Sequence, residues 1–136
     1  MANLTIAESD VRVVKRGDEH QHTAPAGEAI VAGQYIRQDP STGKFVLGNG
    51  TSAAEVGDGY IAENSAAIGD PVTGHKMPVV LDVGAALSGL DYGASVFLSN
   101  TDGTLADVAG TVSTVVGKVI AGWAGSAKKL LRLALN

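Results

Sequence analysis

The chain has 136 residues and a formal net charge of −4. This length fits one domain, and the acidic balance excludes the broad positive field of a typical nucleic-acid-binding protein. The absence of cysteine excludes thiol catalysis, Cys-ligated zinc, iron–sulfur clusters and disulfide bonds. Glycine is abundant, with 18 residues, and aromatic residues make up only 4% of the chain. The composition predicts an all-β domain, rich in turns, whose core consists mainly of Val, Leu, Ile and Ala.

Charge is distributed unevenly along the chain. Residues 1–17 carry a net charge of +1, residues 18–107 carry −9 and residues 108–136 carry +4. The basic residues near the C-terminus alternate with leucines, which favours a strand with a solvated outer face over a membrane or nucleic-acid patch. The N-terminus lacks the features of a secretion signal, and no window is apolar enough to span a membrane. We therefore expect neither a membrane nor a nucleic acid among the partners.

Short apolar runs separated by turn signals predict the strands. The first is Val11–Val14, and Glu19–Gly27 follows as a linker because it lacks periodicity and contains Pro25. Further strands are predicted over residues 34–38, 44–47, 60–62, 78–83, 95–99, 115–121 and 130–135. Helical turns are possible at residues 53–55 and 66–68. We divide the chain into an N-terminal arm and linker, residues 1–25, and one β-rich domain, residues 26–136.

Two tight turns suggest an internal duplication. Residues 39–43 and 99–103 each end in a glycine suited to positive φ, Gly43 and Gly103, and they lie 60 residues apart. The same offset relates residues 30–62 to residues 90–122 without gaps. Identical pairs at this offset are Gly33/Gly93, Gly43/Gly103, Gly50/Gly110, Thr51/Thr111, Val56/Val116 and Gly57/Gly117, and Tyr60/Ile120 keeps its apolar character. Because one copy has too little apolar surface to fold alone, we expect both copies to close one barrel or sandwich.

The motifs of known active sites fail in this sequence. Gly48–Ala53 fits the pattern G-x-G-x-x-A, but Gly57 follows too closely for the helix that a dinucleotide site needs. His20, His22 and His75 could bind a metal, yet two of them lie in the predicted linker and no fourth ligand is evident. We therefore interpret the three histidines as solvated polar residues. The sequence predicts no catalytic, cofactor-binding or metal site, and no enzyme.

One run of residues resembles a known family. It comprises the turn Ser41-Thr42-Gly43, the triplet Lys44-Phe45-Val46, Gly50-Thr51, and Val56-Gly57 ahead of the strand ending at Ala62. With Ala26–Gly33 before it, Met77–Leu81 after it and a second copy over Gly93–Gly122, this run resembles the head-decoration, or cement, proteins of tailed double-stranded DNA bacteriophages. The resemblance covers about residues 24–135. Gly59 departs from the pattern, because an apolar residue is usual there, and is expected to weaken the strand that follows.

The resemblance implies a structural role. It implies a small β-barrel or β-tulip-like domain without cofactor or enzymatic activity. The protein would be made in the host cytoplasm and would sit on the outer surface of the virion's icosahedral capsid, as a homotrimer at three-fold or quasi-three-fold positions. There it would bind the major capsid protein and stabilise the mature head against internal DNA pressure. An extended N-terminal arm would hold the shell, with contact candidates Leu4, Ile6, Val11, Arg12, Val13 and Val14.

Two alternatives accompany this interpretation. Val11–Val14 could instead be the first strand of the barrel, or a strand exchanged within a trimer. The protein could also be a ligand- or carbohydrate-binding β-barrel accessory protein of the virion. Exposed aromatic platforms would favour that function, and the small number of aromatic residues disfavours it.

Overall fold

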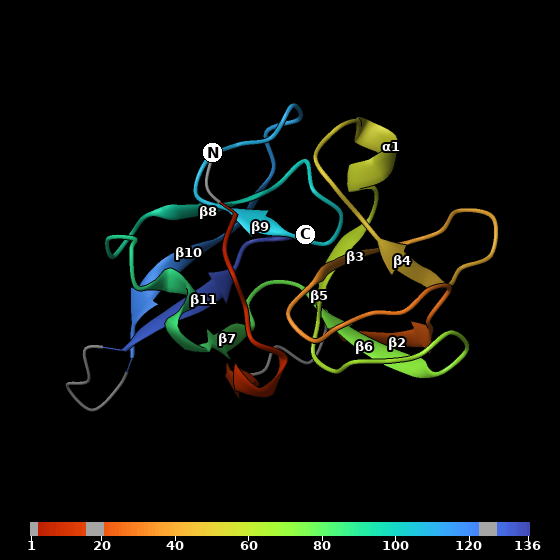
Figure 1. The fold of residues 1–136 in the computed structure, drawn as a ribbon, viewed down its shortest axis with the longest axis horizontal. Coiled ribbons are helices and arrows are strands. Elements are labelled where there is room, and N and C mark those ends of the chain that lie inside the picture. The colour runs from red at the N-terminus through yellow and green to blue at the C-terminus, as the bar shows by residue number, and fades with distance from the viewer. Residues whose placement is uncertain (1–2, 16–20, 123–127) are drawn as a thin grey trace.

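The computed structural model describes residues 3–15, 21–122 and 128–136 and is almost entirely β (Figure 1). Its strands form two sheets, one of which curls into a half-barrel. The all-β prediction is therefore confirmed. No helix in the described part of the chain is long and apolar enough to cross a membrane.

The first sheet has five strands and the second has six. In spatial order, the five-stranded sheet contains β2 (Gln21–Pro25), β6 (Pro71–His75), β5 (Gly59–Ala62), β3 (Tyr35–Gln38) and β4 (Phe45–Leu47). The six-stranded sheet contains β1 (Val11–Lys15), β7 (Val80–Val83), β11 (Lys129–Leu133), β10 (Val115–Ala121), β8 (Ser95–Leu98) and β9 (Leu105–Ala106). The described residues also contain one short α-helix, α1 (Ala53–Val56), and 3₁₀ helices at Glu8–Asp10 and Gly84–Leu87.

The predicted strands agree with the structure to within two residues at each end. The helical turn predicted at residues 53–55 is also present, as α1, with the Ser52 side chain accepting a hydrogen bond from the Glu55 N–H. The second predicted helical turn, at residues 66–68, is wrong. Ala66 instead forms an isolated β-bridge with Ile30.

The linker expected over Glu19–Gly27 is wrong for residues 21–25. These residues form β2, which pairs with β6 along its whole length. Pro25 lies opposite Pro71 at the end of an edge strand, where the missing N–H groups cost no ladder hydrogen bond. Ala24 is buried, and the hydroxyl groups of Thr23 and Thr73 lie 2.7 Å apart across the two strands. Cross-strand packing therefore stabilises a segment whose own sequence lacks strand periodicity.

The two sheets repeat one topology. Strands β2 to β6 and strands β7 to β11 have the same spatial order, and β1 is an addition at the edge of the second set. Pairing registers also agree. Gln38 pairs with Phe45 and Leu98 pairs with Leu105, an offset of 60 residues. Each copy builds its own sheet, and the expected β-barrel-like fold is present in that one of the two sheets curls into a half-barrel.

The gapless offset of 60 fails after β4 and β9. Ile61 pairs with His75 in the first sheet, and Lys118 pairs with Arg132 in the second, so these strands are related by 57 residues. The first copy contains α1 in this connection, and the shift in offset falls there. The pairs Val56/Val116, Gly57/Gly117 and Tyr60/Ile120 are therefore not structural equivalents.

Equivalent side chains fill the inner face of each sheet. Burial of a Val, Leu, Ile or Phe side chain contributes roughly 1.5–3 kcal/mol, so these residues stabilise each sheet. The equivalent buried pairs are Ala24/Val83, Ile36/Val96, Phe45/Leu105 and Ala62/Val119. In two of these pairs the larger side chain belongs to the first copy, and in the other two it belongs to the second copy.

Tyr35 joins the two sheets. Tyr35 and Ile61 lie on the outer face of the five-stranded sheet, and both belong to the core cluster of the six-stranded sheet. The Tyr35 hydroxyl donates a hydrogen bond of 2.9 Å to the carbonyl oxygen of Val56. Burial raises the pKa of Tyr35 to about 12, and the charge of Asp58 acts in the same direction. The phenol is therefore neutral at physiological pH and serves as a packed hydrogen-bond donor.

Two glycines make room for the Tyr35 ring. A Cβ at Gly48 would lie 2.7 Å from the Cε1 atom of the ring, and a Cβ at Gly59 would overlap its hydroxyl oxygen. The Tyr35 ring thus occupies the space that a side chain at position 59 would need. Strand β5 nevertheless begins at Gly59, and all four of its residues are buried.

We expect Gly59→Ala to destabilise the protein by about 1–3 kcal/mol or more, because the new methyl group must displace the Tyr35 ring from a packed core. The free energy of unfolding in urea measures the effect. Gly89→Ala is the matched control, since a Cβ at Gly89 meets no atom within 4 Å. Equal stability of the two variants would contradict the packing described here.

Candidate interaction surface

The N-terminal segment, residues 3–15, lies against the six-stranded sheet. Asn3 forms a bridge with Ala106, and the Leu4 N–H donates to the Leu105 carbonyl at 2.8 Å, beside β9. Further along, β1 pairs with β7 at the opposite edge of the same sheet. Figure 1 shows this red segment crossing from β9 towards β7. The segment contains the 3₁₀ helix Glu8–Asp10, and its two ends pair with the second sheet instead of forming a separate arm.

The six capsid-contact candidates divide into two groups. Leu4, Ile6 and Val13 pack against the core of the six-stranded sheet, and Val11 is half-buried. Arg12 and Val14 are exposed, Val14 to 42%. Alternating apolar residues are compatible with either a capsid-binding arm or an internal strand. In this protein, the apolar face of the N-terminal segment is covered by its own chain. Arg12 and Val14 stay available for contact with another molecule.

Both predicted turn glycines have the expected positive φ, +73° at Gly43 and +66° at Gly103. Their surroundings differ. A Cβ at Gly43 would meet no atom within 4 Å, whereas a Cβ at Gly103 would lie 3.0 Å from Leu47 and 3.3 Å from Gln34. One turn is therefore exposed, and its counterpart is packed against the other copy.

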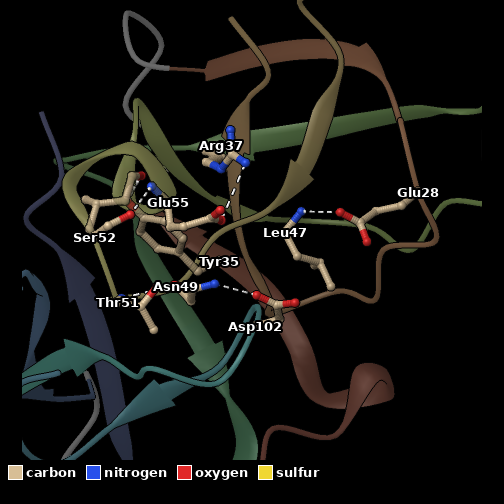
Figure 2. Close-up of polar contacts among 10 residues, drawn as sticks. Glu28, Tyr35, Arg37, Leu47, Asn49, Thr51, Ser52, Glu55 and Asp102 are labelled. Carbon is tan, nitrogen blue, oxygen red and sulfur yellow. Dashed lines mark hydrogen bonds and ion pairs between the residues drawn. The ribbon is translucent and has the colours of Figure 1, made fainter. Parts of the chain in front are cut away.

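The packed turn, residues 99–103, docks on the first copy through backbone hydrogen bonds. The Gly103 N–H donates to Gly48 at 2.7 Å, the Tyr35 N–H donates to Gly103 at 3.0 Å, and Gly50 donates to Ser99 at 2.8 Å. The Asn49 amide nitrogen donates to Asp102 Oδ1 at 2.6 Å, a contact visible in Figure 2. Since these groups bind one another, the cluster stabilises the junction between the sheets.

Figure 2 also shows that the neighbouring polar groups of the first copy are paired. Glu28 accepts a 3.0 Å hydrogen bond from the Leu47 N–H, and Arg37 lies 3.5 Å from Glu55. The dinucleotide-like stretch Gly48–Ala53 therefore forms part of a structural junction, with α1 too short to present a phosphate site. The sequence did not predict that Asn49 and Asp102 join the two copies, because each has the local sequence of an ordinary turn residue and they are 53 positions apart.

The histidines do not gather around a metal. His20 lies outside the described residues. His22 is exposed, and its ring lies near the rings of Phe45 and Tyr60, at centroid distances of 5.7 and 6.2 Å. His75 is fully buried, with its Nε2 atom 2.5 Å from Glu63, so its interpretation as a solvated residue is wrong. Within the described ranges, no group of three or more His, Asp or Glu side chains is placed to hold a metal ion.

Two shallow hollows lie on the second copy and its junction. One, of about 350 Å³, lies between the N-terminal segment and residues 31–34 and 103–105. The other, of about 430 Å³, lies beside Tyr92, which is 51% exposed. There the Lys129 ammonium group lies 5.2 Å from the centre of the Tyr92 ring and donates hydrogen bonds to the carbonyls of Ser88 and Leu90. Tyr92 is therefore an exposed aromatic surface beside a fixed cation.

Comparison of the chain with protein-family models, with curated proteins and with solved structures found no match. The features that bear on function are therefore those of the chain itself. They are the repeated sheets, the docked N-terminal segment and the outer faces of the two sheets.

The two turn glycines differ in the expected cost of substitution. Gly43→Ala should cost about 1 kcal/mol, since a side chain at positive φ is strained but meets open space. Gly103→Ala should cost more, because its methyl group also presses on Leu47 and Gln34. Denaturant unfolding of both variants checks the order. A larger loss at Gly43 would contradict the docking of the second turn.

The N-terminal segment should contribute to folding stability. Val13→Ala should destabilise the protein by about 1 kcal/mol or more, because Val13 packs on the core. Val14→Ala is the matched control on the exposed face of the same strand, with an expected effect within about 0.5 kcal/mol. Thermal unfolding measures both. Equal, negligible effects would indicate that the segment leaves the sheet in solution and behaves as a free arm.

Proposed function

We propose that this protein is a structural virion component that binds the outer surface of an icosahedral phage capsid and stabilises the mature head. The observation that carries the proposal is the position of the residues that resemble cement proteins. In the first copy they run from the β3–β4 turn through β4 and α1 into β5, and in the second they follow the equivalent strands β8, β9 and β10. The resemblance thus follows the repeated structural unit as far as β4 and β9, whereas Val56-Gly57 and Val116-Gly117 occupy different positions in the two copies.

The mechanism is thermodynamic. A protein that binds the mature shell, and no other state of it, lowers the free energy of that state by the free energy of binding. The packed junction suits this role, because a rigid body loses little conformational entropy when it binds. Tyr35 and the turn at residues 99–103 hold the two sheets in one arrangement through burial and short hydrogen bonds.

Attachment as a homotrimer would strengthen weak contacts with the major capsid protein. A contact of ~3 kcal/mol per chain corresponds to a dissociation constant in the millimolar range. Three linked contacts raise the effective concentration of each subunit at its site, and overall binding becomes orders of magnitude tighter. Strand β1 lies at the edge of its sheet, and its residues Arg12 and Val14 are exposed. Of the six capsid-contact candidates, we therefore propose these two as contacts with the shell.

Tyr92 favours a second candidate function, that of a carbohydrate- or ligand-binding accessory protein of the virion. Its ring is 51% exposed beside a hollow, as an aromatic platform for a sugar ring would be. Quenching of tyrosine fluorescence by an oligosaccharide, lost in Tyr92→Ala, would support this function. We rank it second because it depends on a single side chain.

Shells stripped of this protein should lose resistance to heat, chelators or osmotic shock, and should regain it when the protein is added back. The temperature at which packaged DNA is released measures resistance. An unrelated acidic protein of similar size, added at the same concentration, is the control. Identical release temperatures with and without the protein would overturn the proposed function.

A further inference from the structure

Equivalent rows of side chains cross the outer faces of the two sheets. In the five-stranded sheet the row is Gln21, His75, Ile61 and Tyr35, and in the six-stranded sheet it is Val80, Arg132, Lys118 and Ser95. The first row is the face through which one copy packs on the other. Tyr35, Ile61 and His75 are each at most 1% exposed. In the second row Lys118 and Arg132 are exposed to solvent, Ser95 is half-buried and Val80 is buried.

Lys118 and Arg132 stand directly opposite each other on β10 and β11. Their neighbours in sequence, Val119 and Leu131, are buried in the core, so both cationic side chains point to the outer face. Neither side chain has an ion-pair or hydrogen-bond partner among the residues that the structure describes. Like charges at directly opposed positions of a sheet destabilise it. The free protein thus carries a repulsion between these two exposed side chains.

Two more cations lie further along this face. Arg12 on β1 is opposite Asp82 on β7, and the Lys128 ammonium group lies 2.6 Å from Asp82 Oδ2. Burial acts to raise the pKa of Asp82, but hydrogen bonds from Lys128 and the Gly84 N–H, and the charges of Lys128 and Arg12, outweigh it and lower the pKa below its ordinary value. These residues place four cations on the outer face of the six-stranded sheet and one carboxylate, Asp82, which is already paired with Lys128.

We propose that the outer face of the six-stranded sheet, centred on Lys118 and Arg132, is a docking surface for an acidic protein partner. The equivalent face of the first copy is already an interface, so the fold itself uses this position for association. The two unpaired cations select carboxylates, and a partner carboxylate between them would relieve their repulsion. The identification of this partner as the shell protein rests on the proposed function. The preference of the surface for carboxylates rests on its two cations alone.

Poly-L-glutamate is the first probe, because it supplies carboxylates without any specific shell. Titration at low salt should shift the backbone amide signals of Ser95, Lys118 and Arg132 in NMR spectra, and added salt should reverse the shifts. The double variant Lys118→Glu/Arg132→Glu should bind at least five-fold more weakly. Lys44→Glu, a reversal of an exposed cation on the first copy, should bind like the wild type.

Several results would overturn the docking surface. They are the absence of binding, shifts located elsewhere, equal affinity of the double variant, tighter binding of duplex DNA than of polyglutamate, and self-association through this face without any probe. The single variant Lys118→Glu adds a stability test. Its melting temperature should equal or exceed that of the wild type, because the like-charge pair becomes an ion pair. A lower melting temperature would show that Lys118 serves the fold instead.

Stripped capsids are the second probe and separate this inference from the proposed function. If the wild type binds them, the double variant should bind at least ten-fold more weakly and Lys44→Glu should not differ. Unchanged binding of the double variant would overturn the docking surface and leave the cement function standing. If the wild type does not bind shells, the cement function fails, and the polyglutamate titration still decides whether the face selects acidic partners.

Discussion

Burial of the Tyr35 side chain is the constraint on which the rest of the structure depends. The ring leaves its own sheet, enters the core of the other and hydrogen-bonds to Val56, so one residue fixes the relative position of both copies. Its size favours glycine at positions 48 and 59, because a Cβ at either position would collide with the Tyr35 ring. The abundance of glycine in this chain thus reflects, in part, the close approach of backbone to an aromatic ring.

The same junction explains why two copies of one topology have different surfaces. The turn at residues 99–103 is packed and hydrogen-bonded to Gly48 and Gly50, while its counterpart at residues 39–43 is open to solvent. In the same way, the N-terminal segment lies along one sheet, and among the described residues the other sheet has no such segment. The two copies share one strand order, but the contact between them gives equivalent turns different surroundings.

Local signals in the sequence predicted most strands and both tight turns, because alternation and turn residues act over a few neighbouring positions. Strands β2, β6 and β9 were missed. The order of β2 comes from its pairing with β6, about fifty residues away. The role of Gly59 was misjudged for a similar reason, because its neighbour Tyr35 is adjacent only in the folded sheet. The unpaired cations illustrate the opposite case. Leucine alternation identified Arg132 as outward-facing, but its position opposite Lys118 requires the sheet register.

The replacement of Tyr35 and Ile61 by Ser95 and Lys118 at equivalent positions also limits the length of the array. The contact between the copies is head-to-tail, because the outer face of one sheet packs on the core of the next. Such contacts propagate without end when every unit presents the same apolar face. The second copy presents a serine and a cation there instead, as the terminal units of repeat proteins present polar outer faces. The chain is therefore a two-unit array whose second unit carries Ser95 and the exposed Lys118 where the first unit carries its apolar contact face.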